Sequence, residues 1–250
     1  MFRMRGLAGV YSAAQSHLPQ KIWVLVLITV VFAALGRAIR GVTTSGAIAG
    51  AAVCLAILLG AGFGGFAALL AVFLLTWAAT RIGYSGKLRS GTAEADSGRN
   101  ERQVLANLGI AGLASLLYAF GGRDARLLLA MTAALAEAAA DTVSSEIGQA
   151  VGGLPRLVTN WRKVPAGTDG AITWIGTLAG LGASIAVAFA ALVGGLFPSH
   201  YLPICVVAGL AGMVADSALG ATLERQGVLG NNAVNFISTA IAAGLAVLFS

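Results

Sequence analysis

Eight apolar segments joined by short loops constrain the fold of this chain more than any other feature. A helix needs about 20 apolar residues to cross the hydrocarbon core of a bilayer, and most of these segments approach that length. The first two are shorter, so the pattern predicts seven or eight membrane spans. The segments run approximately over Ile22–Leu35, Ser45–Leu59, Phe63–Ala79, Val104–Phe120, Ala125–Ala150, Ile172–Leu196, Leu202–Leu223 and Ala233–Phe249.

The composition excludes an ordinary soluble domain. Only 10% of the 250 residues are charged and 58% are hydrophobic, whereas soluble domains carry about 25% charged residues. The 34 glycines suit closely packed membrane helices, because small residues let helix backbones approach in lipid. We therefore predict an all-α, polytopic integral membrane protein with a polar arm over residues 1–21 and a single transmembrane helical domain over 22–250.

The basic residues divide unequally between the two sides that eight crossings would create. One side would hold eleven of the sixteen Lys and Arg residues and the other five, and the positive-inside rule assigns the richer side to the cytoplasm. Most acidic residues fall in or beside the same loops, or on the ends of spans that reach them. The richer side comprises Arg37, Arg40, Arg81, Lys87, Arg89, Arg99, Arg102, Arg156, Arg162, Lys163 and Arg225.

The stretch "AALAEAAADTVSSEIGQ" places Glu137, Asp141 and Glu146 inside an otherwise small and apolar helix. Carboxylates at this depth are unfavourable unless they are paired, protonated or hydrated, and they commonly mark functional sites. Asp216 lies at a similar depth in a parallel span, within "ADS", which echoes "ADT" around Asp141. We predict that Asp141, Asp216 and Glu146 bind a divalent cation such as Mg²⁺, which prefers oxygen ligands. A purely structural hydrogen-bond network is the alternative, and Glu137 fits that role best.

Two loops on the basic side have the composition of phosphate-binding segments. In "GRAIRGVTTSG", Arg37 and Arg40 are flanked by glycines, and we group Ser45 with them as a candidate for binding substrate or nucleotide. Arginine grips phosphate oxygens bidentately, although an ordinary topological anchor explains the arginines equally well. The second loop, "LPRLVTNWRKVPAGTDG", offers the candidates Arg156, Arg162, Lys163, Thr168 and Asp169.

Helix capping is the competing explanation for several polar residues near these loops. Thr168 or Asp169 would cap the span that follows, and Asn231 would cap the last span. Asn107, Asn231 and Asn232 are also candidates for contacting phosphate, sugar or base, while Asn235 is better explained by an interhelical hydrogen bond. The polar loop 83–99 either covers a nucleotide with Lys87, Arg89 and Arg99 or is simply solvated.

Other chemistries have little support in the sequence. His17 and His200 fall on the side opposite the acids, which disfavours a histidine-based triad or a zinc site. The chain has no Walker-type or dinucleotide-binding glycine motif, and its two cysteines lie in apolar runs. Although the net charge is +6, the basic residues occupy short loops between spans, so we predict no nucleic-acid partner.

Taken in order, five motifs resemble the DUF92 / transmembrane protein 19 family. They are "GRAIRGVTTSGAIAG", "RQVLANLG", "AEAAADTVSSEIG", "GTDGAITWIGTLAG" and "ADSALGATLERQG" followed by "NNAVNF". The resemblance covers nearly all of the chain after Gly36. The family includes a plant chloroplast phytyl-phosphate kinase of tocopherol synthesis, and it is similar to CTP-dependent phytol and dolichol kinases. Where the family usually has a second glycine after Asp169-Gly170, this chain has Ala171.

The resemblance implies transfer of the γ-phosphoryl group of CTP to an isoprenyl monophosphate such as phytyl or geranylgeranyl phosphate. Asp141 and Glu146 would then serve the metal and nucleotide, surrounded by Asn107, Thr168, Asp169, Asp216, Asn231 and Asn232. The implied partners are the lipid phosphate, a nucleoside triphosphate, Mg²⁺ and membrane lipids, with homo-oligomerisation left open. A bacterial plasma membrane with the active site facing the cytoplasm is the expected location. A lipid cytidylyltransferase, a kinase of the free isoprenoid alcohol and an ion-coupled transporter remain as alternatives.

Overall fold

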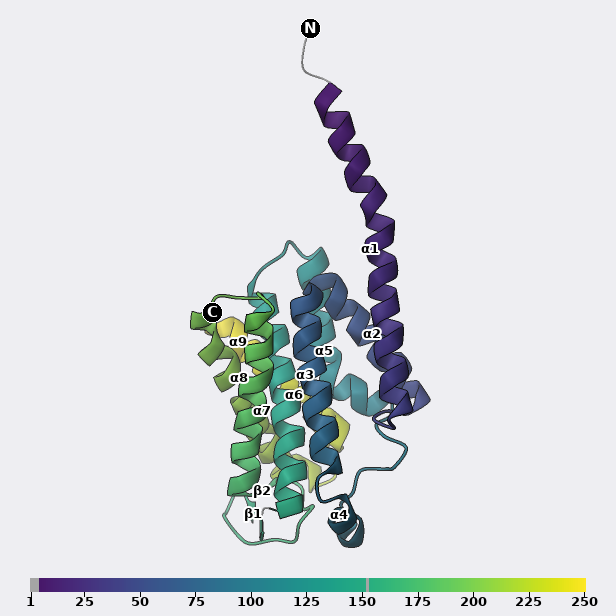
Figure 1. Ribbon diagram of the computed structural model, residues 1–250. Coiled ribbons are helices and arrows are strands. Elements are labelled where there is room, and N and C mark those ends of the chain that lie inside the picture. The colour runs from purple at the N-terminus through teal and green to yellow at the C-terminus, as the bar shows by residue number, and fades with distance from the viewer. Residues whose placement is uncertain (1–4, 152) are drawn as a thin grey trace.

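The computed structural model describes residues 5–151 and 153–250 and forms a helical bundle with only one small β-ribbon (Figure 1). Six helices are long and apolar enough to cross a membrane, and two shorter apolar helices, 22–38 and 44–60, accompany them. The prediction of an all-α integral membrane protein is confirmed. The elements are α1 (Arg5–Ala38), α2 (Thr44–Gly60), α3 (Gly62–Arg81), α4 (Tyr84–Ser90), α5 (Glu101–Phe120), α6 (Arg126–Val151), β1 (Arg156–Leu157), β2 (Ala171–Ile172), α7 (Trp174–Val193), a 3-10 turn (Ser199–Tyr201), α8 (Leu202–Leu219), a π-helical turn (Gly220–Glu224) and α9 (Asn231–Leu248).

Helix α1 includes the first apolar segment and begins well before it. Residues 5–21 of the polar arm continue the same helix, whereas residues 1–4, including Arg3, lie outside the described part of the chain. The other apolar segments became α2, α3, α5, α6, α7, α8 with its π-helical turn, and α9, with bounds that differ from the sequence pattern by a few residues.

Helix α6 is the axis of the bundle and contacts α3, α5, α7, α8 and α9. Its central residues from Leu128 to Ala140 are fully buried and mostly alanine. Glycines on the neighbouring helices let their backbones approach this surface: a Cβ on Gly176 of α7 would clash with the carbonyl oxygen of Ser144, and one on Gly209 of α8 would lie 3.0 Å from Cβ of Ala136. Small residues thus provide close packing where no hydrophobic effect drives helices together.

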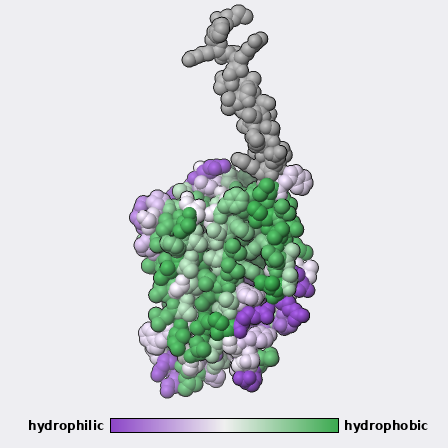
Figure 2. All heavy atoms as spheres, in the orientation of Figure 1, coloured by the Kyte–Doolittle hydropathy of each residue, from purple (hydrophilic) through white to green (hydrophobic). Residues whose placement is uncertain are grey.

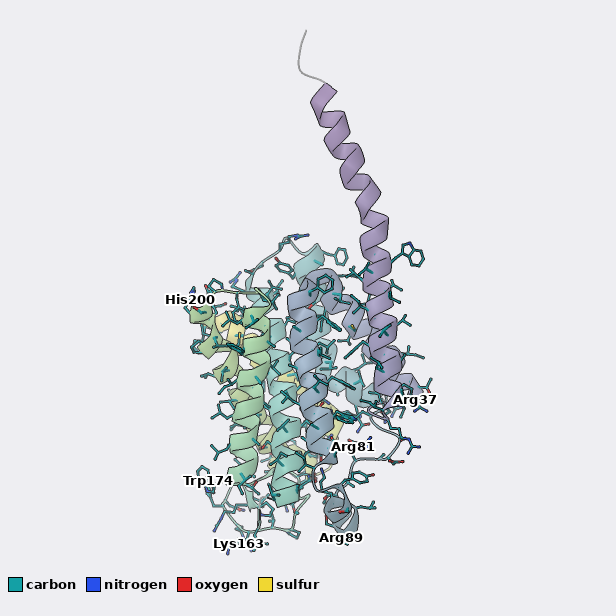
Figure 3. The ribbon with its side chains drawn as sticks, viewed as in Figure 1. Arg37, Arg81, Arg89, Lys163, Trp174 and His200 are labelled. Atoms are coloured by element: carbon teal, nitrogen blue, oxygen red, sulfur yellow. The ribbon has the colours of Figure 1, made fainter. Side chains whose placement is uncertain are left out.

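The surface has the distribution expected of a bilayer-embedded protein. Apolar residues dominate the sides of the bundle, and polar residues gather toward its ends (Figure 2). Large side chains such as Leu178 and Phe189 of α7 and Val207 of α8 are exposed there. Figure 3 shows Arg81, Arg89 and Lys163 toward one end of the bundle and His200 at the other. The β1–β2 ribbon lies at the basic end, so the charged loops and the ends of α6, α7 and α8 meet there.

Candidate functional site

The two deepest aspartates of the predicted site face each other between neighbouring helices. Asp141 of α6 and Asp216 of α8 are within hydrogen-bonding range of one another, and the hydroxyl of Ser238 on α9 donates to Oδ2 of Asp216 at 3.3 Å. Two carboxylates in contact can both remain ionised only if a cation balances their charge, and otherwise one of them takes up a proton. This pair is therefore the part of the site best suited to hold a cation.

The aspartate pair opens into a polar cavity of about 370 Å³ at the basic end of the bundle. Within the described residues its wall contains no histidine or cysteine, and the side chains that could ligate a metal offer oxygen. The structure brings together seven predicted residues in this wall, namely Asn107, Asp141, Glu146, Thr168, Asp169, Asp216 and Asn231. The β1–β2 ribbon and the ends of α6, α8 and α9 supply most of these residues.

Glu146 lines the same cavity but is already neutralised by a buried lysine. The ammonium group of Lys87, on α4, bonds to Oε2 of Glu146 and donates to the carbonyl oxygens of Ala79 at 3.2 Å and Thr80 at 2.8 Å. The Thr80 hydroxyl donates to the other Glu146 oxygen at 3.2 Å. Lys87 is only 1% exposed, so loop 83–99 is anchored in the bundle rather than freely solvated.

The third predicted metal ligand therefore does not join the aspartate pair. Among the residues that the structure describes, no three His, Cys, Asp or Glu side chains are grouped closely enough to hold a metal ion. Mg²⁺ commonly uses only one or two protein carboxylates and completes its coordination with water and substrate phosphates. The facing pair with its all-oxygen surroundings fits that pattern, while Glu146 fits a structural role.

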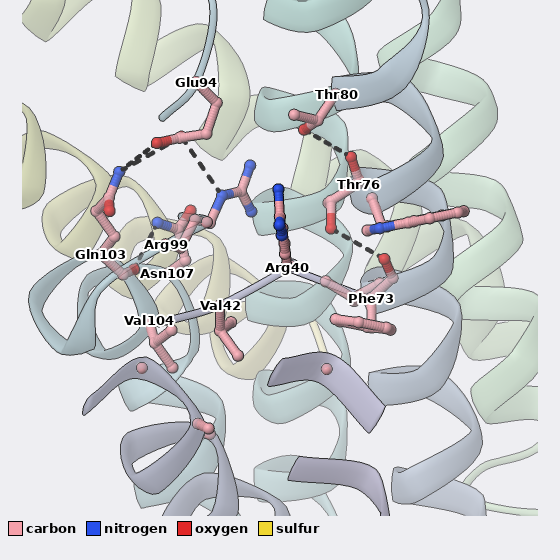
Figure 4. A pocket seen from close by; sticks show the side chains of 18 of the residues that line it. Arg40, Val42, Phe73, Thr76, Thr80, Glu94, Arg99, Gln103, Val104 and Asn107 are labelled. Carbon is pink, nitrogen blue, oxygen red and sulfur yellow. Dashed lines mark hydrogen bonds and ion pairs between the residues drawn. The ribbon is translucent and has the colours of Figure 1, made fainter. Parts of the chain in front are cut away.

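In the described part of the chain, Arg99 is the one basic residue that lines the polar cavity. Its guanidinium donates to the Thr142 hydroxyl at 3.5 Å, lies 3.8 Å from the Glu94 carboxylate and faces Asp141. Glu94 in turn accepts from Gln103 at 3.3 Å, as Figure 4 shows. The sequence named Arg99 among the basic residues of loop 83–99 that either cover a nucleotide or are solvated. In the structure Arg99 directly precedes Asn100, which caps α5 through a capping box.

The loop "GRAIRGVTTSG" contributes through its backbone more than through its arginines. The Thr43 amide donates to the Arg99 carbonyl at 2.9 Å, and the Arg99 amide donates to the Gly41 carbonyl at 3.2 Å. A Cβ on Gly46 would collide with that same Arg99 carbonyl. These contacts fix Arg99 at the cavity wall.

The predicted side chains of this loop lie outside the polar cavity. Arg37 donates to the Thr44 hydroxyl at 3.2 Å, and Arg40 pairs with Asp96 at 2.9 Å. Ser45 donates to Glu101 at 2.5 Å. Because each side chain has a nearby protein partner, none of them is free to act on a ligand in this cavity without first changing partner.

The candidate residues of the second predicted phosphate-binding loop are also divided between the cavity wall and the outer surface. Arg156, Arg162 and Lys163 are exposed on the β1–β2 ribbon and do not line the cavity, whereas Thr168 and Asp169 do. The predicted capping of α7 by Thr168 or Asp169 is wrong: Thr173 caps it, accepting from the Gly176 amide, and Thr168 donates to the Pro165 carbonyl at 2.7 Å. The reason is that β2 intervenes, so α7 begins only at Trp174.

The asparagines of α5 and α9 support the aspartate pair. With its amide oriented to satisfy its neighbours, Asn235 accepts from Asn107 at 3.1 Å and donates to Asp216 at 3.2 Å. The predicted interhelical role of Asn235 is thus correct, and the residue also positions Asp216. The predicted cap at Asn231 is wrong, because Gly230 occupies that position. Asn232 lies in a shallow surface hollow that adjoins the polar cavity, with which it shares Glu94, Gln103 and Asn231.

One further feature beside the cavity has no counterpart in the sequence analysis. Helix α8 continues into a π-helical turn over Gly220–Glu224, which begins one helical turn after Asp216. Gly170, with φ of 71°, packs so closely against this turn that a Cβ would collide with the Ala221 amide nitrogen. Such π-turns are frequent at functional sites. This one brings the Thr168–Gly170 loop against the end of α8.

Comparison with known proteins gives the relationships of the chain. The family model described as "Integral membrane protein DUF92" matches residues 27–243. The chain belongs to this family. No solved structure matches it.

The curated relatives include membrane proteins of an archaeon and of the cyanobacterium Synechocystis sp., and proteins of a plant. An uncharacterized membrane protein of Methanocaldococcus jannaschii is 36% identical over 91% of this chain and 94% of its own length. Protein PGR of Arabidopsis thaliana is 30% identical over 84% of this chain and 90% of its own length. The chloroplastic protein VTE6 of the same plant is 32% identical over 75% of this chain, and the match spans 59% of VTE6 itself.

Proposed function

We propose that this DUF92 protein is a CTP-dependent isoprenyl-monophosphate kinase. The observation that carries the proposal is the facing pair Asp141 and Asp216 in a polar cavity at the basic end of a membrane bundle. The resemblance of the sequence to a family that includes a plant phytyl-phosphate kinase supplies the substrate class. A cavity at a membrane end suits a reaction between a water-soluble nucleotide and a lipid whose phosphate lies at the interface.

In the proposed reaction, an oxygen of the lipid phosphate forms a bond to the γ-phosphorus of CTP. The bond between that phosphorus and the β–γ bridging oxygen breaks. The two products are CDP, which takes the bridging oxygen, and the lipid diphosphate. A phosphate monoester is largely dianionic near neutral pH, so its oxygen needs no catalytic base. This agrees with the absence of histidine from the described wall of the cavity.

The main obstacle is then the repulsion between two anionic reactants, and the protein must neutralise charge and align them. Asp141 and Asp216 would hold Mg²⁺, which neutralises the phosphates of the nucleotide. Arg99 supplies a fixed positive charge beside the pair. Asn107 and Asn235 hold Asp216 in place, while Thr168, Asp169 and Asn231 are available to contact nucleotide.

The positive-inside rule supports a cytoplasmic orientation for this cavity, because the basic loops surround it. The nucleotide would enter from the cytoplasm and the lipid from the inner leaflet. A bacterial plasma membrane is the location that we propose for this arrangement.

The test is transfer of radiolabelled γ-phosphate from CTP to phytyl, geranylgeranyl or farnesyl monophosphate by the purified protein in detergent. Asp141→Asn should abolish transfer, and Asp124→Asn is the matched control because Asp124 lies in the α5–α6 loop, at the opposite end of the bundle, and pairs with Arg126. No transfer to any of the three lipids would overturn the proposal. Release of pyrophosphate would indicate a cytidylyltransferase instead, and activity on phytol itself would indicate an alcohol kinase. Ion-gradient-dependent uptake in proteoliposomes without nucleotide would indicate a transporter.

A further inference from the structure

A second, smaller cavity of about 100 Å³ lies beside the polar one, between α1, α2, α3 and α5, and we call it the apolar groove. Its wall is largely hydrophobic and includes Phe32, Leu69, Val72, Phe73, Val104 and Leu108. Four residues line both spaces, namely Glu94, Arg99, Gln103 and Asn107. The apolar groove therefore adjoins the candidate active site, and these four residues form the boundary between the two spaces.

The outer side of the groove is closed by aromatic side chains rather than by close helix packing. Helix α1 packs on α2, and it reaches α3 through the ring of Phe32. This ring meets Phe66 at 5.5 Å and Phe73 at 5.4 Å between centroids, both edge to face. Side chains can change rotamer within nanoseconds when they are not tightly packed. A lipid chain would enter the groove from the bilayer on this side, between α1 and α3.

The end of the groove toward the basic loops carries three arginines: Arg40, Arg81 and Arg99. Arg81 stacks over Trp77 at 5.6 Å and donates to the Ile39 carbonyl, and Arg40 is held by Asp96. In the part of the chain that the structure describes, Arg99 is the one basic residue that lines both the groove and the polar cavity. Figure 4 shows Arg40 and Arg99 on one side of Phe73 and Thr76 in this groove.

We propose that the apolar groove binds the first isoprene units of an isoprenyl monophosphate, so that Arg99 holds its phosphate at the boundary of the polar cavity. The apolar wall matches the hydrocarbon, and the arginines match the negative charge at the end of the same ligand. The shared wall directs the terminal phosphate oxygens toward Asp141 and Asp216. Because the groove is small, the rest of the chain lies in the bilayer. This inference rests on the proposed function for its choice of ligand.

Gly50 offers a way to fill the groove without disturbing its walls. It lines the groove in the middle of α2, and a Cβ there would meet no atom within 4 Å. Gly50→Leu therefore projects a side chain into the open space, and leucine is also a better helix former than glycine. Gly182→Leu is the matched control, because Gly182 of α7 is exposed and its Cβ would likewise meet nothing within 4 Å.

The experiment measures binding of geranylgeranyl monophosphate and of CTP with Mg²⁺ separately, in detergent, for the wild type and both variants. We expect Gly50→Leu to weaken lipid binding by about tenfold or more, since a misfit of a single methylene group in an apolar pocket already changes specificity by about that factor. Nucleotide binding should be unchanged, and Gly182→Leu should behave as the wild type. Equal lipid binding by all three proteins would overturn the proposal.

A second measurement uses the wild type alone and does not depend on the variant folding. Geranylgeranyl monophosphate that carries a diazirine in its first isoprene unit is cross-linked by light, and the labelled peptides are identified. Labels on residues 32–36, 69–73 or 104–108 support the groove, whereas labels confined to the lipid-facing surface of α7 would contradict it. If lipid binding depends on Gly50 but no phosphoryl transfer occurs, the proposed function fails and the groove stands. If transfer occurs and Gly50→Leu has no effect on lipid binding, the proposed function stands and the groove is not the lipid-binding site.

Discussion

Two of the carboxylates of helix α6, Asp141 and Glu146, lie five residues apart in surroundings that differ completely. Glu146 is bonded to Lys87, which two carbonyl oxygens hold in a buried position. Asp141 faces another carboxylate, Asp216. In the first case one lysine balances one carboxylate, and in the second case two carboxylates share the nearby Arg99, which leaves an excess of negative charge for a ligand to balance. The difference separates a group that stabilises the fold from a group that awaits a ligand.

The largest expected effect is on catalysis, from Asp216→Asn. The substitution removes one of the two charges that would hold the cation, so we expect transfer to fall by about 10²–10³-fold or more. Thermal unfolding in detergent should show stability that is unchanged or raised, because the repulsion between the two carboxylates is relieved. A variant that loses both stability and activity would show that Asp216, like Glu146, stabilises the fold. The contrast between Glu146 and the aspartate pair would then be wrong.

Lys87→Met should affect mainly stability. Removing one partner of a buried ion pair leaves the other charge without compensation, which typically costs about 3–5 kcal/mol. Denaturant or thermal unfolding of the purified protein measures this loss.

The double variant Lys87→Met/Glu146→Gln sharpens that test, because it removes both charges and should recover much of the stability. Activity should recover with it if Glu146 is structural. If stability returns but transfer does not, Glu146 contributes to catalysis, as the sequence first suggested.

Gly46→Ala should have an intermediate effect through Arg99. A Cβ at this position collides with the Arg99 carbonyl, and overpacking of this kind typically costs about 1–3 kcal/mol. Because the backbone of Arg99 must move, we expect a higher KM for the lipid phosphate than in the wild type. Gly244→Ala on α9, where a Cβ meets nothing within 4 Å, is the control. Kinetics indistinguishable between these two variants would show that the loop does not position Arg99.

The smallest effect concerns an exposed pair at the opposite end, Asp124 and Arg126. The Arg126 side chain, which donates hydrogen bonds to the Asp124 carboxylate, lowers the pKa of Asp124 from its ordinary value of 3.8. Its contribution to stability is therefore present above pH 3.8 and is lost as the pH falls through the lowered pKa. Exposed pairs contribute little, so the wild type should be only slightly more stable than Asp124→Asn at pH 6, and this small difference should disappear as the pH falls below 3.8. A large difference at pH 6 would contradict this description.

The fold was largely predictable because bilayer spans are defined by length and apolar composition, which are local properties. The aspartate pair was also predictable, since Asp141 and Asp216 occur at matching depths in parallel spans. What the sequence could not reveal depends on partners distant in the chain. Lys87 and Arg99 occur in a polar loop that resembles a flexible linker, and only their contacts with Glu146 and with the Gly41–Thr43 backbone distinguish them from solvated charges. Arg156, Arg162 and Lys163 resemble phosphate ligands in sequence, yet the β1–β2 ribbon directs them away from the cavity.

The buried lysine of α4 has a thermodynamic consequence for ligand binding. Ordering a polar loop upon association usually subtracts from affinity, because conformational entropy is lost at that moment. Here the membrane helices immobilise the segment between α3 and α5 through Lys87 during folding, before any ligand arrives. This segment of the cavity wall, which contains Arg99, is thus ordered before the ligand binds. More of the attraction between Arg99 and an incoming anion therefore remains available as binding free energy.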